Sequence, residues 1–351
     1  MATKLKRMTP SARSGMLTYG LVILAYAVLE GLLSGGLLSS SMKGLLVPIC
    51  AYVVMAISLN LTVGVMGELS LGHAGFMSVG AYTAVIAAAA MQSTVTSGPV
   101  RLALAMAVGG VFAGLVSLIV VVPVLRLRGD YLAIVTLAFG EIIKNIINCL
   151  YVGLDETGLH MSMKDAASLN MAADGKMLLQ GPMGAVGIQK LSGLTAGFLL
   201  IMVALVVVLN FVNSRAGRAV MALRDNRIAA ESVGISPTRY KMMAFVTSAV
   251  LAGFAGGLYA MNFSSILAKK FDFNTSILIL VFVVLGGMGN ICGSIIAAAA
   301  LTVLPELLRE FADYRMLVYA VVLILVMLFT NNPACKAVFA RLTGRSGKEA
   351  A

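Results

Sequence analysis

The stretch Leu45–Met66 reads LLVPICAYVVMAISLNLTVGVM and contains no charged side chain. A transmembrane helix needs about 20 consecutive apolar residues, so this run is long enough to cross a bilayer. A polar stretch, GELSLGHAGF, begins at Gly67 and separates the run from the next apolar segment. The sequence therefore predicts two membrane spans that are joined by a short polar break.

The rest of the chain has the same character. Of its 351 residues, 60% are hydrophobic and 12% are charged, whereas a soluble globular domain carries roughly 25% charged residues. The composition therefore predicts an all-α integral membrane protein, with a single transmembrane domain over 1–351. About ten hydrophobic segments are expected, at 17–34, 45–66, 69–91, 101–124, 131–151, 194–212, 240–260, 275–288, 291–308 and 315–331.

The stretch GGMGN at Gly286–Asn290 divides the eighth segment from the ninth. Glycines can break a helix at membrane depth, and such a break is tolerated only where protein or a water-filled cavity covers the backbone. We therefore expect broken helices here. Because 275–308 can also be re-entrant, the predicted number of spans stays between about eight and ten.

The basic residues predict the orientation. They gather in four places: the N-terminus, the connection that holds Arg126 and Arg128, the stretch 214–243, and the C-terminal tail. A ten-span chain that begins inside places all four on the cytoplasmic side, as the positive-inside rule requires. The long connection 153–193 lacks this bias and is expected outside. Since the net charge of +11 reflects these connections, we expect membrane lipid and not nucleic acid as a partner.

The sequence carries no pattern that is typical of catalysis. The two histidines, His73 and His160, do not belong to a histidine and carboxylate constellation, and the four cysteines show no CxxC spacing. A phosphate-binding G-x-x-x-x-G-K-[ST] loop is also absent from the sequence. We therefore expect no catalytic residue, metal or cofactor in this chain.

If the chain moves a solute uphill, the energy must come from an ion gradient or from another polypeptide. An ion-coupled secondary transporter typically holds intramembrane acids that bind protons or ions, and Glu68 and Glu141 are the candidates. A permease driven by a separate ATPase needs no such acid. A membrane scaffold without transport is the third hypothesis.

The charged stretch 214–243 interrupts the apolar pattern for about thirty residues and contains six basic side chains. Gly234 is predicted to end a helix at C′, and Ser236–Pro237 to start the next span as N-cap and N1. A soluble partner could bind an apolar face on this stretch; its expected members are Val220, Leu223, Ile228 and Val233. The alternative is a basic amphipathic helix that lies on anionic lipid.

Two polar clusters are candidates for the lining of a solute pathway. In GELSLGHAGF, a lining or gate near the cytoplasmic side is predicted, and the alternative is a packed turn in which His73 is simply hydrogen-bonded. The predicted gate residues are Glu68, Ser70, Gly72, His73 and Gly75.

The second cluster lies in the fifth segment, where Glu141, Lys144, Asn145 and Asn148 share one helical face. Such a face avoids lipid and could line the route of a zwitterionic solute, with Glu141 and Lys144 neutralising each other. The alternative is that these side chains hold neighbouring helices together.

Four stretches resemble one family. They read GELSLGHAGFMSVGAYTA (Gly67–Ala84), LRGDYLAIVTLAFGEI (Leu127–Ile142), ALRDNRIAAESVGISPTRYKMMAF (Ala222–Phe245) and VVLGGMGNICGSIIAAAALTVLPELLRE (Val283–Glu310). Together they are similar to the M-type permease subunit of the branched-chain amino-acid ABC importers. The resemblance implies a permease of the vitamin B12-importer type in a bacterial cytoplasmic membrane. It also implies a sister permease, two cytoplasmic ATPases that use ATP and Mg²⁺, and an extracytoplasmic binding protein for leucine, isoleucine or valine.

The resemblance further implies that AAESVG, at Ala229–Gly234, is the segment that couples the permease to its ATPases. It is similar to the EAA-x-x-x-G loop of importer permeases, although Ile228 stands where that loop has Glu and Arg227 stands where an acid is expected. The expected coupling residues are Arg224, Asp225, Ala229, Ala230, Glu231 and Gly234. Related permeases carry urea, short amides, other amino acids or sugars, so the transport class is more firmly implied than the substrate.

Overall fold

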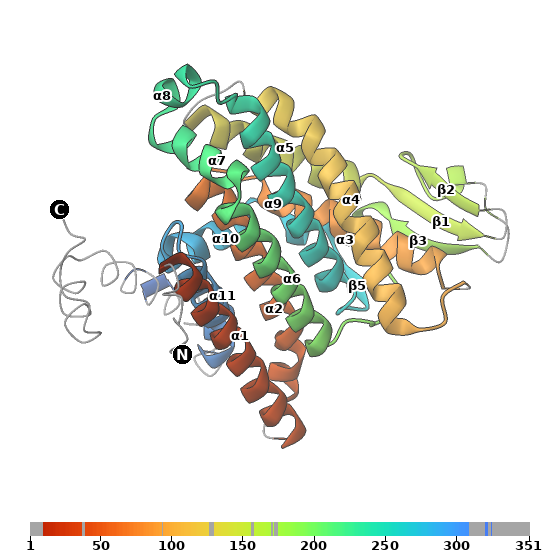
Figure 1. Ribbon diagram of the computed structural model, residues 1–351. Coiled ribbons are helices and arrows are strands. Elements are labelled where there is room, and N and C mark those ends of the chain that lie inside the picture. Colours follow the sequence, from red (N-terminus) through yellow and green to blue (C-terminus); the bar gives the residue numbers. More distant parts are fainter. Residues whose placement is uncertain are drawn as a thin grey trace. The chain divides into compact units, whose positions relative to one another are not determined.

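The computed structural model describes residues 10–36, 39–92, 94–125, 130–155, 158–169, 171, 175–308, 320, 321 and 324. The chain divides into two compact units, Met1–Ala298 and Ala299–Ala351, and the architecture given below is that of the first unit (Figure 1). The tenth predicted segment, 315–331, lies outside the described residues except at 320, 321 and 324.

Seven of the described helices are long and apolar enough to cross a membrane. They are α1 (Pro10–Ser34), α2 (Ser40–Asn60), α3 (His73–Ala90), α4 (Gly98–Val124), α5 (Asp130–Asn148), α6 (Leu194–Asn213) and α9 (Pro237–Ala260). A π-helical turn, η1 (Leu61–Val65), continues α2. The first seven predicted segments are therefore confirmed as helices.

The predicted break at GGMGN is also confirmed. Two shorter apolar helices, α10 (Phe273–Gly286) and α11 (Ile291–Leu307), flank it. Gly287 and Gly289 have φ angles of 91° and 84°, which side chains with a Cβ rarely adopt. The glycines therefore end α10 and allow the chain to turn before α11 begins.

The prediction of an all-α protein is wrong in the long connection after α5. Five antiparallel strands form a sheet in the order β2-β1-β3-β4-β5. They are β1 (Tyr151–Asp155), β2 (Gly158–Ser162), β3 (Lys176–Gln180), β4 (Ala185–Val186) and β5 (Ser265–Ile266), with short 3₁₀ turns at η2 (Ala167–Leu169), η3 (Gly181–Met183) and η4 (Ala268–Phe271). These strands are too short to show a clear period of two in the sequence, and β5 comes from the connection after α9.

The helices pack through small residues. A Cβ added to Gly80 of α3 would lie 2.2 Å from the carbonyl oxygen of Gly253 in α9, and one on Gly256 would lie 2.0 Å from that of Met77. Backbones therefore approach closely here, as is typical of helix contacts in membranes. From Leu46 to Asn60, nearly every residue of α2 is buried, so α2 lies in the core of this unit.

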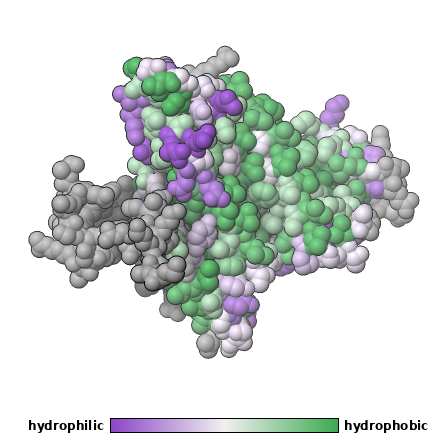
Figure 2. Space-filling view, viewed as in Figure 1, coloured by the Kyte–Doolittle hydropathy of each residue, from purple (hydrophilic) through white to green (hydrophobic). Residues whose placement is uncertain are grey.

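The surface divides into an apolar body and a polar cap. Figure 2 shows apolar residues over most of the visible helical surface and hydrophilic ones gathered over α7 (Arg215–Asp225) and α8 (Arg227–Ser232). On α4, the exposed large apolar residues include Val111, Phe112, Leu115, Leu118, Ile119 and Val122. Such a continuous apolar surface is typical of contact with lipid or with another membrane subunit.

Candidate functional site

The charged stretch after α6 folds into two short helices with defined ends. The Ser214 hydroxyl accepts a hydrogen bond from the Gly217 N–H at 3.1 Å and starts α7, and the Asn226 side chain accepts one from the Ala229 N–H at 3.1 Å and starts α8. Both are N-caps, which stabilise a helix by about 1 kcal/mol. The chain therefore bends at Asn226 between two separately capped helices.

The predicted stop at Gly234 is confirmed. Gly234 has a φ of 86°; its N–H donates to the Glu231 carbonyl at 3.0 Å, and the Ile235 N–H donates to the Ala230 carbonyl at 3.1 Å. These two bonds form a Schellman motif with glycine at C′. Pro237 then stands in the first turn of α9, where Ser236 takes the N-cap position without a capping bond from its side chain.

The predicted apolar contact face is wrong for half of its members. Val220 and Leu223 are buried, whereas Ile228 is 83% exposed and Val233 is 75% exposed. The reason is the bend at Asn226. The prediction assumed one continuous helix, so residues after the bend do not lie on the same face as residues before it. Ala230, an expected coupling residue, is also buried. The surface left for a partner is therefore centred on Ile228 and Val233.

Arg224 is directed into the protein and not only toward a partner. Its Nη1 donates to the Gly64 carbonyl at 2.9 Å, while its Nη2 lies 3.1 Å from the Asp225 carboxylate. Its aliphatic stem covers Gly67, where an added Cβ would lie 2.5 Å from the Arg224 Cγ. Arg224 thus ties α7 to the turn that ends the second span. The exposed pair Arg227–Glu231, at 2.6 Å, lies within α8.

The end of α2 is bound in turn to the break between α10 and α11. Asn60 is fully buried; its Oδ1 accepts from the Gly289 N–H at 2.8 Å and its Nδ2 donates to the Ser294 hydroxyl at 2.8 Å. A Cβ on Gly64 would lie 2.2 Å from the Gly289 nitrogen. Asn60 and Ser294 were not predicted from the sequence, although a lone Asn within an apolar span is a signal of such a contact.

In GELSLGHAGF the structure shows a tightly packed turn. Lys241 of α9 pairs with Glu68, and both side chains are largely buried. His73 is buried and its Nε2 lies 2.7 Å from the Ser58 hydroxyl. The Ser70 hydroxyl is buried and has no hydrogen-bond partner among the described residues. In this conformation the segment matches the packed-turn alternative, and gating stays a prediction.

The two predicted pathway clusters lie side by side. A Cβ on Gly72 would lie 2.0 Å from the Thr136 carbonyl oxygen of α5, and Gly75 and Glu141 line the same narrow crevice. On the polar face of α5, Glu141 pairs with Lys144 as expected, and Asn145 is exposed. The opposite face of α5 holds the buried Ile143 and Ile147.

Nothing in the described part of the chain forms a metal site: no group of three or more His, Cys, Asp or Glu side chains gathers there. The hydrogen bonds around Gly64 join the polar helix pair α7 and α8 to the end of α2, and the end of α2 to the break between α10 and α11.

Comparison with known proteins identifies the family. The sequence profile of the family described as "Branched-chain amino acid transport system / permease component" matches residues 41–328. The chain belongs to this family. The matched range covers nearly all of α2, the polar helix pair α7 and α8, and both helices that flank GGMGN. All elements of the candidate site therefore lie within the part of the chain that matches the family.

Two curated relatives of this permease are similar over most of the chain. The high-affinity branched-chain amino acid transport system permease protein LivM of Escherichia coli (strain K12) is 35% identical over 291 residues. The protein of the same name from Salmonella typhimurium is 34% identical over 287 residues. Each match covers 79% of this chain and spans 66% of the relative's length. No solved structure matches the chain.

A third relative shares a shorter region. The fructose import permease protein FruG of Bifidobacterium longum is 29% identical over 119 residues, which is 32% of this chain and 35% of that protein. Permeases named for different solutes therefore share part of this sequence.

Proposed function

We propose that this chain is the transmembrane permease subunit of an ABC importer for branched-chain amino acids: leucine, isoleucine and valine. The observation that carries the proposal is the family match over residues 41–328, together with similarity to two permeases that are named for these solutes. The alternative is an importer for another small solute, such as urea, an amide or another amino acid. The shorter similarity to a fructose permease shows that permeases for other solutes share part of this sequence.

The proposed assembly contains a sister permease, two cytoplasmic ATPases that bind ATP and Mg²⁺, and an extracytoplasmic binding protein. The fold is proposed to be of the vitamin B12-importer type, in the bacterial cytoplasmic membrane with both termini inside. The supporting observation is the separation of surfaces: a polar helix pair stands at one end of an apolar body (Figure 2). A polar cap of this kind is a suitable contact for a soluble ATPase.

In the proposed coupling mechanism, the ATPase contacts α8 through Ile228, Ala229 and Val233, and displaces α7 and α8 as it closes. Arg224 transmits this displacement, because its guanidinium binds the Gly64 carbonyl directly. The movement then reaches the break at Gly289 through Asn60. One contact at the polar cap would therefore act on the end of α2 and on the break between α10 and α11.

The proposed pathway runs along the turn at 68–75 and the polar face of α5, with Lys144 and Asn145 beside it. The exposure of Asn145 supports this placement, because a polar side chain within a membrane span avoids lipid and faces a cavity or another subunit. We place the sister permease against this face.

An ion-coupled secondary transporter is a weaker hypothesis on structural grounds. Its two candidate carboxylates are both engaged: Glu68 pairs with Lys241, and Glu141 pairs with Lys144. A carboxylate that is held by a lysine is poorly available to bind a coupling ion.

The test is reconstitution of the chain with its co-expressed partner subunits. Leucine uptake and ATP hydrolysis stimulated by the binding protein are measured together in vesicles. The double variant Ile228→Asp/Val233→Asp should remain in the membrane but lose both activities, because it places charge on the exposed surface of α8. Met183→Asp is the control, since Met183 is also exposed, at 64%, but lies in the connection after α5. Normal activities in the double variant would instead favour a lipid contact for α8.

A further inference from the structure

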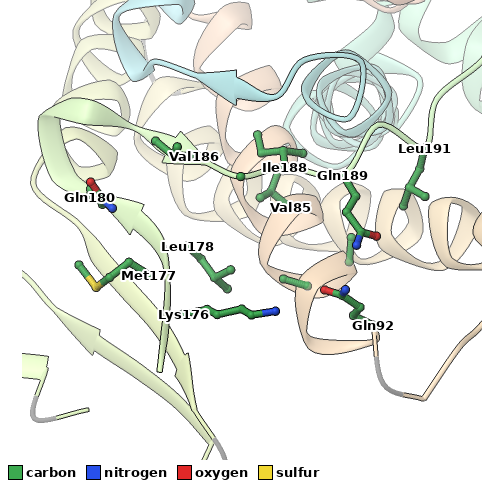
Figure 3. Close-up of a pocket in the computed structure, with 13 residues that line it drawn as sticks. Val85, Gln92, Lys176, Met177, Leu178, Gln180, Val186, Ile188, Gln189 and Leu191 are labelled. Carbon is green, nitrogen blue, oxygen red and sulfur yellow. The ribbon is translucent and has the colours of Figure 1, made fainter. Parts of the chain in front are cut away.

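A cavity of about 430 Å³ lies beside the end of α3, away from the candidate site. Its walls are the last turns of α3, strand β3 and the chain that leads into α6 (Figure 3). A volume of this size is within the range of small-molecule sites in proteins. It takes no part in the coupling route proposed above.

The cavity lies at the height where two membrane spans end. Val85 and Ala88 belong to the last turns of α3, which ends at Ala90, and Ile188 lies a few residues before α6 begins at Leu194. The cavity therefore extends across the boundary between the hydrocarbon and the headgroup region of a bilayer. Apolar side chains line its membrane part, and its polar groups come mostly from the connecting chain.

The polar side chains that line the cavity carry one positive charge, and all of them can donate hydrogen bonds. Lys176, Gln92 and Gln189 extend toward the same part of the cavity in Figure 3. Within the described structure, Lys176 forms no ion pair, and the thirteen lining residues include no carboxylate. An anion that enters the cavity therefore meets one lysine ammonium and carboxamide N–H groups.

Arg101 holds one of these side chains, Gln189, in place. It is buried, its Nη2 donates to the Gln189 Oε1 at 2.6 Å, and its Nε has no hydrogen-bond partner among the described residues. Because Arg101 occupies the oxygen of Gln189, the amide nitrogen of Gln189 stays available to donate into the cavity. The guanidinium also adds a second positive charge close to the cavity.

We propose that this cavity binds an anionic phospholipid. Its phosphate would contact Lys176, Gln92 and Gln189, and the part of an acyl chain nearest the headgroup would contact Val85 and Ala88. The gradient from apolar to cationic walls matches the gradient along such a lipid. A branched-chain amino acid fits less well, because its ammonium would meet Lys176 and no lining carboxylate. The proposal does not depend on which solute the permease carries.

The test measures lipid binding to the full-length protein purified from membranes in a mild detergent. Phosphatidylglycerol and phosphatidylcholine with identical acyl chains are titrated separately, and bound lipid is counted by native mass spectrometry. Lys176→Gln should weaken phosphatidylglycerol binding about fivefold, or about 1 kcal/mol, and leave phosphatidylcholine binding unchanged. Lys190→Gln is the matched control, since Lys190 is an exposed lysine of the same connection that does not line the cavity.

A second variant separates a lipid from a free anion. Ala88→Leu fills the apolar end of the cavity and should weaken the binding of both lipids, whereas inorganic phosphate should compete poorly with phosphatidylglycerol. The lipid assignment is overturned if inorganic phosphate displaces phosphatidylglycerol readily and Ala88→Leu has no effect. Equal losses in Lys176→Gln and Lys190→Gln would overturn the cavity itself as the site. If Ala88→Leu fails to fold, competition by inorganic phosphate on the unmodified protein decides between a lipid and a free anion.

Discussion

Gly64→Ala is the sharpest perturbation of the proposed coupling route. A Cβ at this position would lie 1.9 Å from the Asn60 Oδ1 and 2.2 Å from the Gly289 nitrogen, whereas real Cβ contacts are essentially never shorter than 3.0 Å. The Asn60 side chain could rotate away, but the Gly289 backbone could not. The end of α2 and the break between α10 and α11 must therefore move apart by roughly 0.8 Å, and such overpacking costs about 1–3 kcal/mol.

The displacement of Asn60 adds to this cost. Asn60 would leave the Gly289 N–H and the Ser294 hydroxyl, and each buried polar group without a partner costs about 1–3 kcal/mol. Some relaxation is available, so we expect Gly64→Ala to destabilise the permease by about 3 kcal/mol in total. Thermal unfolding of the purified protein in detergent measures this loss.

Gly44→Ala is the matched control in the same helix. Gly44 is exposed, and a Cβ there meets no atom within 4 Å. Because alanine favours a helix over glycine by up to about 1 kcal/mol, Gly44→Ala should be neutral or slightly stabilising. Uptake should remain at the wild-type level in Gly44→Ala and fall strongly in Gly64→Ala.

Two results would contradict this reasoning. Unchanged unfolding and uptake in Gly64→Ala would mean that Gly64 and Gly289 are not in contact. A destabilised variant that still hydrolyses ATP and transports in the normal ratio would show that the contact holds the helices together without transmitting movement.

Three further predictions test the packing of the site. Glu68→Gln should destabilise the protein by about 3 kcal/mol in detergent unfolding, because it leaves Lys241 buried without its charged partner. Adding Lys241→Met should restore much of that stability. A double variant that is no more stable than Glu68→Gln would contradict the pairing. Gly234→Val should abolish uptake without preventing membrane insertion, because a β-branched residue is strained by about 1–3 kcal/mol at a φ of 86°. Normal uptake in this variant would refute the need for glycine at this position. In a cysteine-free background, Leu69→Cys should react with polar thiol reagents in every state, since Leu69 is 39% exposed. Ser70→Cys, at a buried position, should react only when nucleotide opens the turn. A Ser70→Cys variant that never reacts would contradict gating.

The sequence was sufficient for the first seven spans and for the end of α8 at Gly234. Apolar runs of membrane length have few other solutions, because backbone groups in lipid must be satisfied within a helix. The stop at Gly234 and the break at GGMGN also follow from local chemistry, since each needs a backbone conformation that glycine adopts easily. These features depend on neighbouring residues alone.

The features that sequence analysis missed depend on residues far apart in the chain. Strand β5 completes a sheet that begins after α5, and its two residues, Ser265–Ile266, carry no strand signal of their own. The contact face of the coupling helices was wrong because the bend at Asn226 is set by capping, and hydrophobic periodicity does not reveal it. The role of Asn60 required knowing that Gly289 is its neighbour.

Side chains from other elements satisfy backbone groups of this permease at several helix ends. Where a helix ends or breaks, backbone groups lose their helical partners, and in an apolar environment each must find another. Side chains from other elements supply those partners in four places: Arg224 for the Gly64 carbonyl, Asn60 for the Gly289 N–H, Thr136 for the Leu71 N–H, and Ser276 for the Ala74 N–H.

The proposed coupling mechanism depends on these contacts between elements. A helix held by its own backbone moves as a rigid unit, but a break that is held by a side chain of another helix moves when that helix moves. Because α7 supplies Arg224, a displacement of the polar cap must either carry Gly64 with it or break the part-buried hydrogen bond between Arg224 and the Gly64 carbonyl. Asn60 lies one helical turn from Gly64 and accepts from the Gly289 N–H, so the proposed coupling mechanism expects the break between α10 and α11 to follow the same movement.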